Sequence, residues 1–165
     1  MEIASFKTIK ACLSDAEELA KSLSTEDYDE LVANRSGVYV DAKAALEEAI
    51  KSCEASYSIV NEKTGQTYAI GGYTDKGICW FLTSNYVKNF NKEERMALRD
   101  ELCKNRDAAL LVHPVLHNYI WVGNPAHIWF TESCGARMSG QVLGQNGEYY
   151  VPFEFCIEDF PHLMK

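Results

Sequence analysis

Cysteine and histidine carry the most reactive side chains in this sequence, since both residue types bind zinc and serve as catalytic nucleophiles or bases. Zinc sites usually draw ligands from close pairs, because a short turn places two thiolates on one edge of a tetrahedron. His113 and His117 have the spacing of helical zinc ligands, but Pro114 between them would disrupt that helix. The six cysteines form no such pair, because each lies more than 20 residues from the next: Cys12, Cys53, Cys79, Cys103, Cys134 and Cys156. We therefore expect no metal site and six reduced thiols that pack as small hydrophobic side chains.

A cysteine nucleophile, a histidine base and an aromatic groove are the other chemistries that single residues suggest. No signature of a cysteine nucleophile surrounds Cys134, and the chain has neither a GxSxG elbow nor a Walker loop. His127 is typical of a packed, hydrogen-bonded helical histidine, with a role as base or partner contact as the alternative. Trp80, Trp121 and Trp129 are typical of an aromatic core, with the lining of an acyl or peptide groove as the alternative.

The spacing of apolar residues predicts the helices that carry these side chains. Two helices begin at capping boxes, in which two side chains three residues apart bond each other's backbone N–H groups: Ser14 with Glu17, and Asn91 with Glu94. Another helix starts at Pro125 and ends before a glycine, the asymmetry expected of helix ends. The predicted helices cover residues 14–23, 24–34, 42–53, 91–107 and 125–133.

Runs of aromatic and β-branched residues between turn signals predict the strands. In residues 77–83, Ile78, Trp80 and Leu82 alternate with other apolar residues, which predicts a central strand covered on both faces. The mixed order of elements favours an α/β (α+β) fold with a mixed, largely antiparallel central sheet and helices on both faces. No repeat or linker divides the chain, so we expect a single domain over residues 1–165. The predicted strands cover residues 6–11, 57–61, 67–73, 77–83, 116–122, 137–143 and 149–157.

Composition excludes several classes of function. The 165 residues carry 16 basic and 24 acidic side chains, a formal charge of −8, whereas a protein that tracks nucleic-acid phosphates needs a basic face. No apolar run approaches the roughly 18 residues of a membrane span, so we expect no membrane insertion. Residues 1–4 have neither a basic nor an apolar signal region, and we expect no secretory signal peptide.

The helix that follows Asn124 provides the link to a known family. An apolar residue lies four positions on, Ile128, an acidic residue eight on, Glu132, and a glycine eleven on, Gly135. This spacing resembles the segment after the fifth strand of GNAT (Gcn5-related N-acetyltransferase) enzymes, and the predicted order of elements resembles the GNAT fold over nearly the whole chain. The strand around Trp80 and the Asn–x–x–His–Ile helix resemble more closely a GNAT-like family of short-tailed bacteriophages, the internal virion protein A type.

The resemblance implies an acetyl-CoA cleft between residues 77–83 and 116–122, which splay apart in the GNAT fold. GNAT catalysis rests mainly on positioning and proton transfer in such a cleft. The residues of this chain that would line a remnant of the cleft are Trp80, Leu82, Thr83, Asn85, Lys88, Asn124, His127 and Thr131.

The chain departs from the GNAT pattern at each chemical position that the resemblance implies. GNAT enzymes bind the pyrophosphate of acetyl-CoA with a glycine-rich loop after the fourth strand, but residues 83–90 contain no glycine. Only Lys88 and the helix start at Asn91 are left to attract an anion. Thr131 stands where many GNAT enzymes have a tyrosine general acid, and the usual carboxylate base on the strand has no obvious counterpart. We therefore expect a degenerate site with no catalytic residue and no bound cofactor.

Three functions fit this combination of fold and missing chemistry. The first is a non-catalytic phage virion protein that acts in assembly or ejection and contacts other virion proteins or a host protein. The second is an active N-acyltransferase that uses acetyl-CoA with an atypical loop. The third is an acidic inhibitor that engages a basic host protein by charge, although the chain lacks a dense run of carboxylates. We expect the first, with the protein in the virion or the host cytoplasm; a homo-oligomer is compatible with it.

Overall fold

A computed structural model describes residues 5–164. Within these residues, eight strands and five helices follow one another in the predicted order, with three short 3-10 helices between or after them. The strands are β1 (Phe6–Lys10), β2 (Ala55–Asn61), β3 (Thr67–Tyr73), β4 (Cys79–Thr83), β5 (Val115–Trp121), β6 (Arg137–Met138), β7 (Val142–Leu143) and β8 (Tyr149–Cys156). The helices are α1 (Leu13–Ser22), α2 (Thr25–Asn34), α3 (Ala42–Ser52), α4 (Lys92–Leu110) and α5 (Pro125–Ser133), and the 3-10 helices are η1 (Asn85–Asn89), η2 (Ile157–Asp159) and η3 (Pro161–Leu163).

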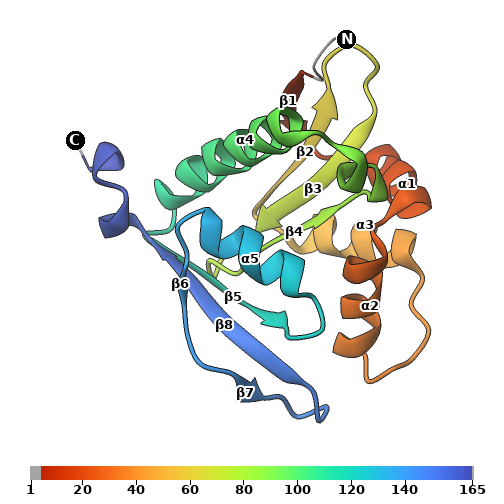
Figure 1. The fold of residues 1–165 in the computed structure, drawn as a ribbon, viewed down its shortest axis with the longest axis vertical. Coiled ribbons are helices and arrows are strands. Elements are labelled where there is room, and N and C mark those ends of the chain that lie inside the picture. Colours follow the sequence, from red (N-terminus) through yellow and green to blue (C-terminus); the bar gives the residue numbers. More distant parts are fainter. Residues whose placement is uncertain (1–4, 165) are drawn as a thin grey trace.

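The strands form two antiparallel sheets that meet at one point (Figure 1). The first sheet has the order β1-β2-β3-β4, and in the second β8 lies between β5 and β6 and also pairs with β7. Within the described residues β4 and β5 approach through a single parallel bridge, Ile78 with His117, and then diverge. Gly77 allows the two strands to approach here, because its φ is +78° and a Cβ at this position would lie 2.8 Å from the carbonyl oxygen of Val115. The predicted splay of these two strands is confirmed.

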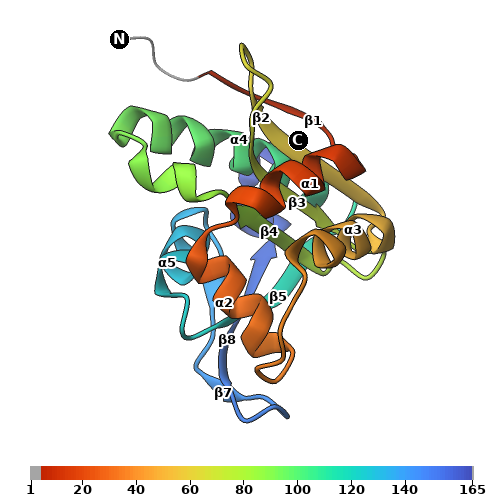
Figure 2. The same cartoon turned by 90° about the vertical axis from the view of Figure 1, so that its right-hand side faces the viewer.

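Helices cover both faces of the first sheet, as predicted (Figure 2). Neighbouring residues on a strand point to opposite faces, and on β3 Ile70 packs with the α1 and α3 cluster whereas Ala69 packs with Leu98 and Leu102 of α4. On β4, Trp80 and Leu82 pack with the first of these clusters and Phe81 with the second, so both of its faces are covered as predicted. The predicted central position is wrong for this sheet, because β4 is its last strand. The second sheet has a core of its own with the end of α4 and with α5, which includes the buried residues Leu116, Ile120, Phe153 and Phe155.

Helix α2 lies beside the ends of β4 and β5, where the two sheets separate (Figure 2). Its N-cap, Ser24, accepts a hydrogen bond from the Asp27 N–H group, as the predicted helix start requires. The backbone of Ser24 donates to the Thr83 carbonyl oxygen at 2.9 Å, and Leu23 forms a bridge with Ser84. These contacts attach the start of α2 to the end of β4.

Several local predictions differ from the structure. The first helix is capped by Cys12, with Asp15 accepting from the Cys12 N–H group at 3.1 Å, so the predicted box of Ser14 and Glu17 is wrong. The helix predicted to end at residue 107 extends to Leu110. The strand predicted over residues 137–143 is two short pieces, since only residues 137–138 and 142–143 pair with β8. Trp129 is no core residue, because 71% of its surface is exposed.

All six cysteines are free thiols, and their surroundings differ. Cys134 and Cys156 are buried, and Cys134 packs in the second core, whereas Cys12 is exposed at the start of α1 and corrects the expectation that every thiol packs inside. His113 and His117 have separate partners: the Nε2 atom of His113 lies 2.9 Å from a Glu54 carboxylate oxygen, and that of His117 lies 3.2 Å from the Lys76 carbonyl oxygen.

None of the helices within residues 5–164 is long and apolar enough to cross a membrane. Residues 1–4, on which the expectation of no signal peptide rests, lie outside the described part of the chain.

Candidate functional site

A cavity of about 240 Å³ lies where β4 and β5 diverge. Aromatic and aliphatic side chains form much of its wall, including Phe81 of β4 and Phe130 of α5. Its polar lining includes Asp27 and Glu30 of α2 and His127 of α5. The cavity therefore brings titratable groups from two helices into the cleft that the GNAT resemblance implies.

Asp27 binds the end of β4. The backbone N–H and the hydroxyl of Thr83 both donate to its Oδ2 atom, at 2.8 and 3.0 Å. Asp27 is buried, and a buried carboxylate needs such donors to offset the loss of water. Glu30, one helical turn later, is also buried, and its Oε2 atom accepts from the Trp121 N–H group of β5 at 3.1 Å. The two carboxylates thus connect α2 to both diverging strands.

Asn124 connects the two carboxylates to each other and to α5. Its side-chain amide donates one hydrogen to Asp27 Oδ1 and one to Glu30 Oε1, each at 2.9 Å, and only 1% of its surface is exposed. Its Oδ1 atom accepts from the His127 N–H group at 3.4 Å, which makes Asn124 the N-cap of α5. The predicted Asn at this position therefore has a structural role on two helices at once.

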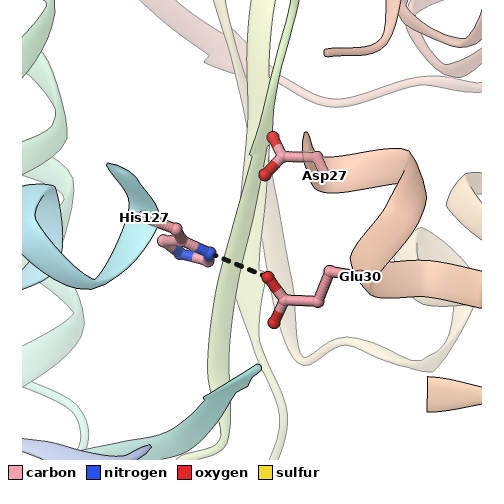
Figure 3. Close-up of side chains that lie close together, drawn as sticks. All are labelled: Asp27, Glu30 and His127. Atoms are coloured by element: carbon pink, nitrogen blue, oxygen red, sulfur yellow. Dashed lines mark hydrogen bonds and ion pairs between the residues drawn. The ribbon is translucent and has the colours of Figure 1, made fainter. Parts of the chain in front are cut away.

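The His127 ring completes the network from the opposite side (Figure 3). Its Nδ1 atom lies 3.4 Å from Glu30 Oε1, and its ring packs edge-on to Phe81 with the ring centroids 4.6 Å apart. Burial disfavours the charged imidazolium, but the hydrogen bond to Glu30 and the negative charges of Asp27 and Glu30 outweigh it, so the pKa of His127 lies above its ordinary value. The predicted packed, hydrogen-bonded histidine is confirmed.

The raised pKa of His127 predicts a pH-dependent contribution to stability. The folded protein binds this proton more tightly than the unfolded chain, so the contribution is complete below the ordinary pKa of 6.5 and is lost as pH rises through the folded value. The free energy of unfolding of the wild type, measured relative to that of His127→Gln, should therefore decrease from about pH 6 to about pH 9. A difference that is the same at every pH would contradict the charged pair.

The same three side chains have the composition of a metal site. One ligand atom from each of Asp27, Glu30 and His127 lies within 4.8 Å of the others, and two carboxylates with an imidazole suit several divalent cations. The Asn124 amide, however, already donates to both carboxylates, and an amide N–H cannot face a cation. The geometry is that of a hydrogen-bonded carboxylate pair, in which the Asn124 amide supplies the positive end of a dipole.

The structure brings only some of the predicted cleft residues together. Thr83, Asn124 and His127 meet at the Asp27 and Glu30 carboxylates, as described above. Trp80 and Leu82 border the cavity and pack with the α1 and α3 cluster, where the Trp80 indole N–H donates to the Cys53 sulfur at 3.1 Å.

Asn85 and Lys88, the predicted cleft residues in the loop after β4, contact α2 and Leu23, which lies two residues before it. The Asn85 side chain donates to the Leu23 carbonyl oxygen at 3.2 Å and accepts from the Thr25 N–H group at 3.3 Å. Lys88 Nζ lies 2.9 Å from a Glu26 carboxylate oxygen, and this bond holds the pKa of Glu26 below its usual value. The loop is therefore occupied with contacts inside the protein.

The loop after β4 does not fit a pyrophosphate. Three N–H groups at this end of β4 already have internal acceptors: that of Thr83 bonds Asp27, that of Ser84 bonds the Tyr68 carbonyl oxygen, and that of Tyr86 bonds the Ser84 hydroxyl. At the start of α4 the Glu94 carboxylate accepts from the Asn91 N–H group at 3.2 Å, which places a negative charge at the helix N-terminus. These four N–H groups are therefore not free to bind a pyrophosphate.

Thr131 and Cys134 are the other buried reactive groups beside the cavity. Only 1% of the surface of Thr131 is exposed, and its hydroxyl has no hydrogen-bond partner within residues 5–164. A hydrogen bond with Cys103, together with burial, raises the pKa of the Cys134 thiol, which is the opposite of what a cysteine nucleophile needs. The Thr131 hydroxyl is therefore free to form a hydrogen bond with a small molecule in the cavity.

Asp27 and Glu30 are not among the residues predicted from the sequence. The signal available was their spacing, because residues three apart lie on one face of a helix and both can point into the protein. Nothing in the local sequence distinguishes them from Asp29, which is exposed on the same helix. Their partners Thr83 and Asn124 lie 56 and more than 90 residues further along the chain.

Comparison with solved structures defines the class of fold. The chain matches a GNAT-family acetyltransferase from Bacillus anthracis with a TM-score of 0.64 and 13% identity, over 96% of this chain and 98% of the other. It matches the spermidine N-acetyltransferase from Vibrio cholerae, solved with CoA and spermine, with a TM-score of 0.62 and 8% identity, over 95% and 98% of the two chains. The fold is therefore that of the GNAT acetyltransferases, as predicted; identities this low establish the fold alone.

Comparison of sequences defines the family. The model of the family described as "Bacteriophage T7, probable scaffold protein Gp13" matches residues 57–141, which is slightly more than half of the chain. Over 83 residues the chain is 35% identical to the probable scaffold protein gp13 of Escherichia phage T7, an alignment that spans 50% of this chain and 59% of the relative. The chain belongs to this phage family, which confirms the predicted resemblance to a GNAT-like phage protein.

Proposed function

We propose that this chain is a non-catalytic virion protein with a GNAT fold, which acts in the assembly or ejection machinery of a phage particle. Its membership of the Gp13 family supports the phage role, because the T7 relative is described as a probable scaffold protein. Its partners in this proposal are other virion proteins or a host protein. It acts in the virion or in the host cytoplasm.

The carboxylates of α2 are the observation that carries the non-catalytic part of the proposal. Asp27 accepts the Thr83 N–H group, so a buried negative charge already lies at the end of β4, and Glu26 already pairs with Lys88, the cation of the following loop. A phosphate brought to the end of β4 would meet the buried Asp27 carboxylate, and like charges repel most strongly where water is excluded. In the proposal, α2 fills the place of a cofactor and holds the two sheets together.

A second candidate, an N-acyltransferase with an atypical loop, is favoured by one observation. The unpartnered Thr131 hydroxyl and the Glu30–His127 pair line the same cavity, which gives the chain a proton acceptor next to a free hydroxyl. Against it, both oxygens of Glu30 already accept hydrogen bonds, and threonine is a far weaker acid than the tyrosine at this position in many GNAT enzymes. The first proposal therefore agrees better with the geometry.

Particle association and acetyl transfer test the two candidates separately. An epitope-tagged copy, produced during infection by the phage that encodes it, should sediment with purified particles and stay with them through a salt wash. Incubation of the pure protein with acetyl-CoA and a polyamine or peptide amine should yield no acetylated product by mass spectrometry. Absence from particles would contradict the virion role, and an acetylated product would show that the chain is an enzyme.

A further inference from the structure

An apolar groove of about 570 Å³ lies outside the network, between α4 and α5. The two helices lie side by side in both views of the fold (Figures 1 and 2). The groove is lined by five apolar and three basic side chains: Val87, Met96, Leu98, Trp129 and Phe130, with Lys92, Arg95 and Arg99. It thus combines a hydrophobic surface with positive charge on a protein whose net charge is −8.

The three cations come from one face of α4. Lys92, Arg95, Met96 and Arg99 follow the spacing i, i+3, i+4 and i+7, which places them on one stripe of the helix. None of Lys92, Arg95 and Arg99 has an ion pair within residues 5–164, whereas Lys88, Lys104, Arg106 and Arg137 do. These three positive charges are therefore available to a partner.

Trp129 supplies the apolar anchor on the opposite side. It is 71% exposed although its neighbours Ile128 and Phe130 pack against the cores, and Met96 across the groove is 46% exposed. Exposed tryptophan and methionine beside unpaired arginine are the residue types enriched in protein interfaces. Leaving them in water on a monomer gives no gain in stability.

We propose that the α4–α5 groove binds an acidic amphipathic segment of a partner protein. The large apolar side chains of the segment fill the groove against Trp129 and Met96, and its carboxylates pair with Lys92, Arg95 and Arg99. The inference rests on the proposed function, since it names the chemistry by which this chain recognises another component of the particle.

Charge and lining favour this occupant over the alternatives. The lining contains no amide, hydroxyl or carboxylate side chain, so the donor groups of a nucleobase would find no side-chain acceptor there. The overall charge of −8 opposes a long polyanion and a second copy of the same acidic chain. A short segment meets the local positive charge and buries its apolar face at the same time.

Two matched peptides test the groove on the full chain. The first is a fluorescein-labelled helical peptide of about 16 residues with leucine and phenylalanine on one face and glutamate on the other, and the second has lysine in place of every glutamate. The acidic peptide should bind in fluorescence anisotropy, and the basic one should bind at least about tenfold more weakly. Binding of the acidic peptide should weaken about tenfold or more in Trp129→Ala and in Lys92→Glu/Arg95→Glu.

Controls elsewhere on the surface separate the groove from general effects. Tyr39→Ala removes an aromatic ring that is 82% exposed, and Lys76→Glu reverses an exposed charge in the turn before β4, so neither should change binding. Failure of the acidic peptide to bind, equal binding of both peptides, or equal losses in the control variants would overturn the proposal. So would displacement of the peptide by CoA or oligothymidylate, or self-association of the chain that Trp129→Ala abolishes. None of these results depends on whether the protein enters particles, which the sedimentation experiment tests.

Discussion

Asp27→Ala is expected to lower the free energy of unfolding by about 3–5 kcal/mol, because each buried donor that it leaves without a partner costs about 1–3 kcal/mol. The variant removes the acceptor for the Thr83 N–H and hydroxyl groups and for one hydrogen of the Asn124 amide. Rotation of the Thr83 hydroxyl can rescue that one donor, but the Thr83 N–H group and one hydrogen of the Asn124 amide lose the acceptor that Asp27 provides. Urea denaturation followed by tryptophan fluorescence measures the loss.

Asp29→Ala is the matched control for this experiment. Asp29 lies on the same helix and loses the same charge, but it is exposed. Its replacement should change stability by less than about 0.5 kcal/mol. If the two variants are equally stable, the Asp27 carboxylate does not hold α2 against β4, and the structural role assigned to it is wrong.

Asn124→Asp is expected to destabilise the protein by a similar amount at neutral pH, about 3–5 kcal/mol, for an electrostatic reason. The amide donates to Asp27 and Glu30 at 2.9 Å each, so the variant replaces a donor by a third carboxylate at the same place. Three carboxyl groups at this distance cannot all ionise out of water, and one of them has to keep a proton in the folded state.

The sign of the pH dependence distinguishes this effect from a simple packing defect. A carboxyl group with a raised pKa in the folded state binds its proton more tightly there than in the unfolded chain, so lowering the pH restores stability. Thermal denaturation of Asn124→Asp should therefore recover toward the wild type as pH falls from about 7 to about 5. Asn89→Asp, the same change at an exposed position of η1, should cost little at either pH. Loss of stability in Asn124→Asp that is independent of pH would contradict the carboxylate cluster.

The helix ends were predicted correctly from the sequence where capping residues lie at the ends themselves. Helix α5 has the predicted bounds, because Asn124 caps its start, Pro125 occupies the first position and Gly135 follows its end with a φ of +95°. Helix α4 begins as predicted, because Asn91 and Glu94 form a capping box. These features need no contact with distant parts of the chain.

The errors occur where a distant contact decides between local alternatives. At α1 the predicted box used Ser14, but Asp15 is buried and accepts from the Ser58 hydroxyl of β2 at 2.9 Å, so its carboxylate faces the sheet and caps the helix at Cys12. In α5 three large apolar residues follow one another, and only the packing of α4 and the sheet determines that Trp129 is the one left exposed. The sequence around residue 129 contains no signal for this choice.

Distant contacts also determine the candidate site, and to a greater extent than they determine the helix ends. The departures of residues 83–90 and Thr131 from the GNAT pattern are visible in the sequence. What replaces the missing chemistry is not, because Asp27, Glu30 and Asn124 meet only after α2 has folded against β4 and β5. The carboxylates that most directly oppose a bound pyrophosphate could therefore be identified only from the structure.

Calorimetric titration of acetyl-CoA into the full chain tests the non-catalytic assignment most directly. A charge-assisted contact to phosphate contributes about 1.5–3 kcal/mol, and the loss of two or three such contacts moves a micromolar dissociation constant to the millimolar range or weaker. We predict no heat of binding at micromolar concentrations, with the spermidine N-acetyltransferase from Vibrio cholerae as the positive control in the same buffer. A micromolar dissociation constant for acetyl-CoA would show that α2 does not fill the place of the cofactor, and would contradict the proposal.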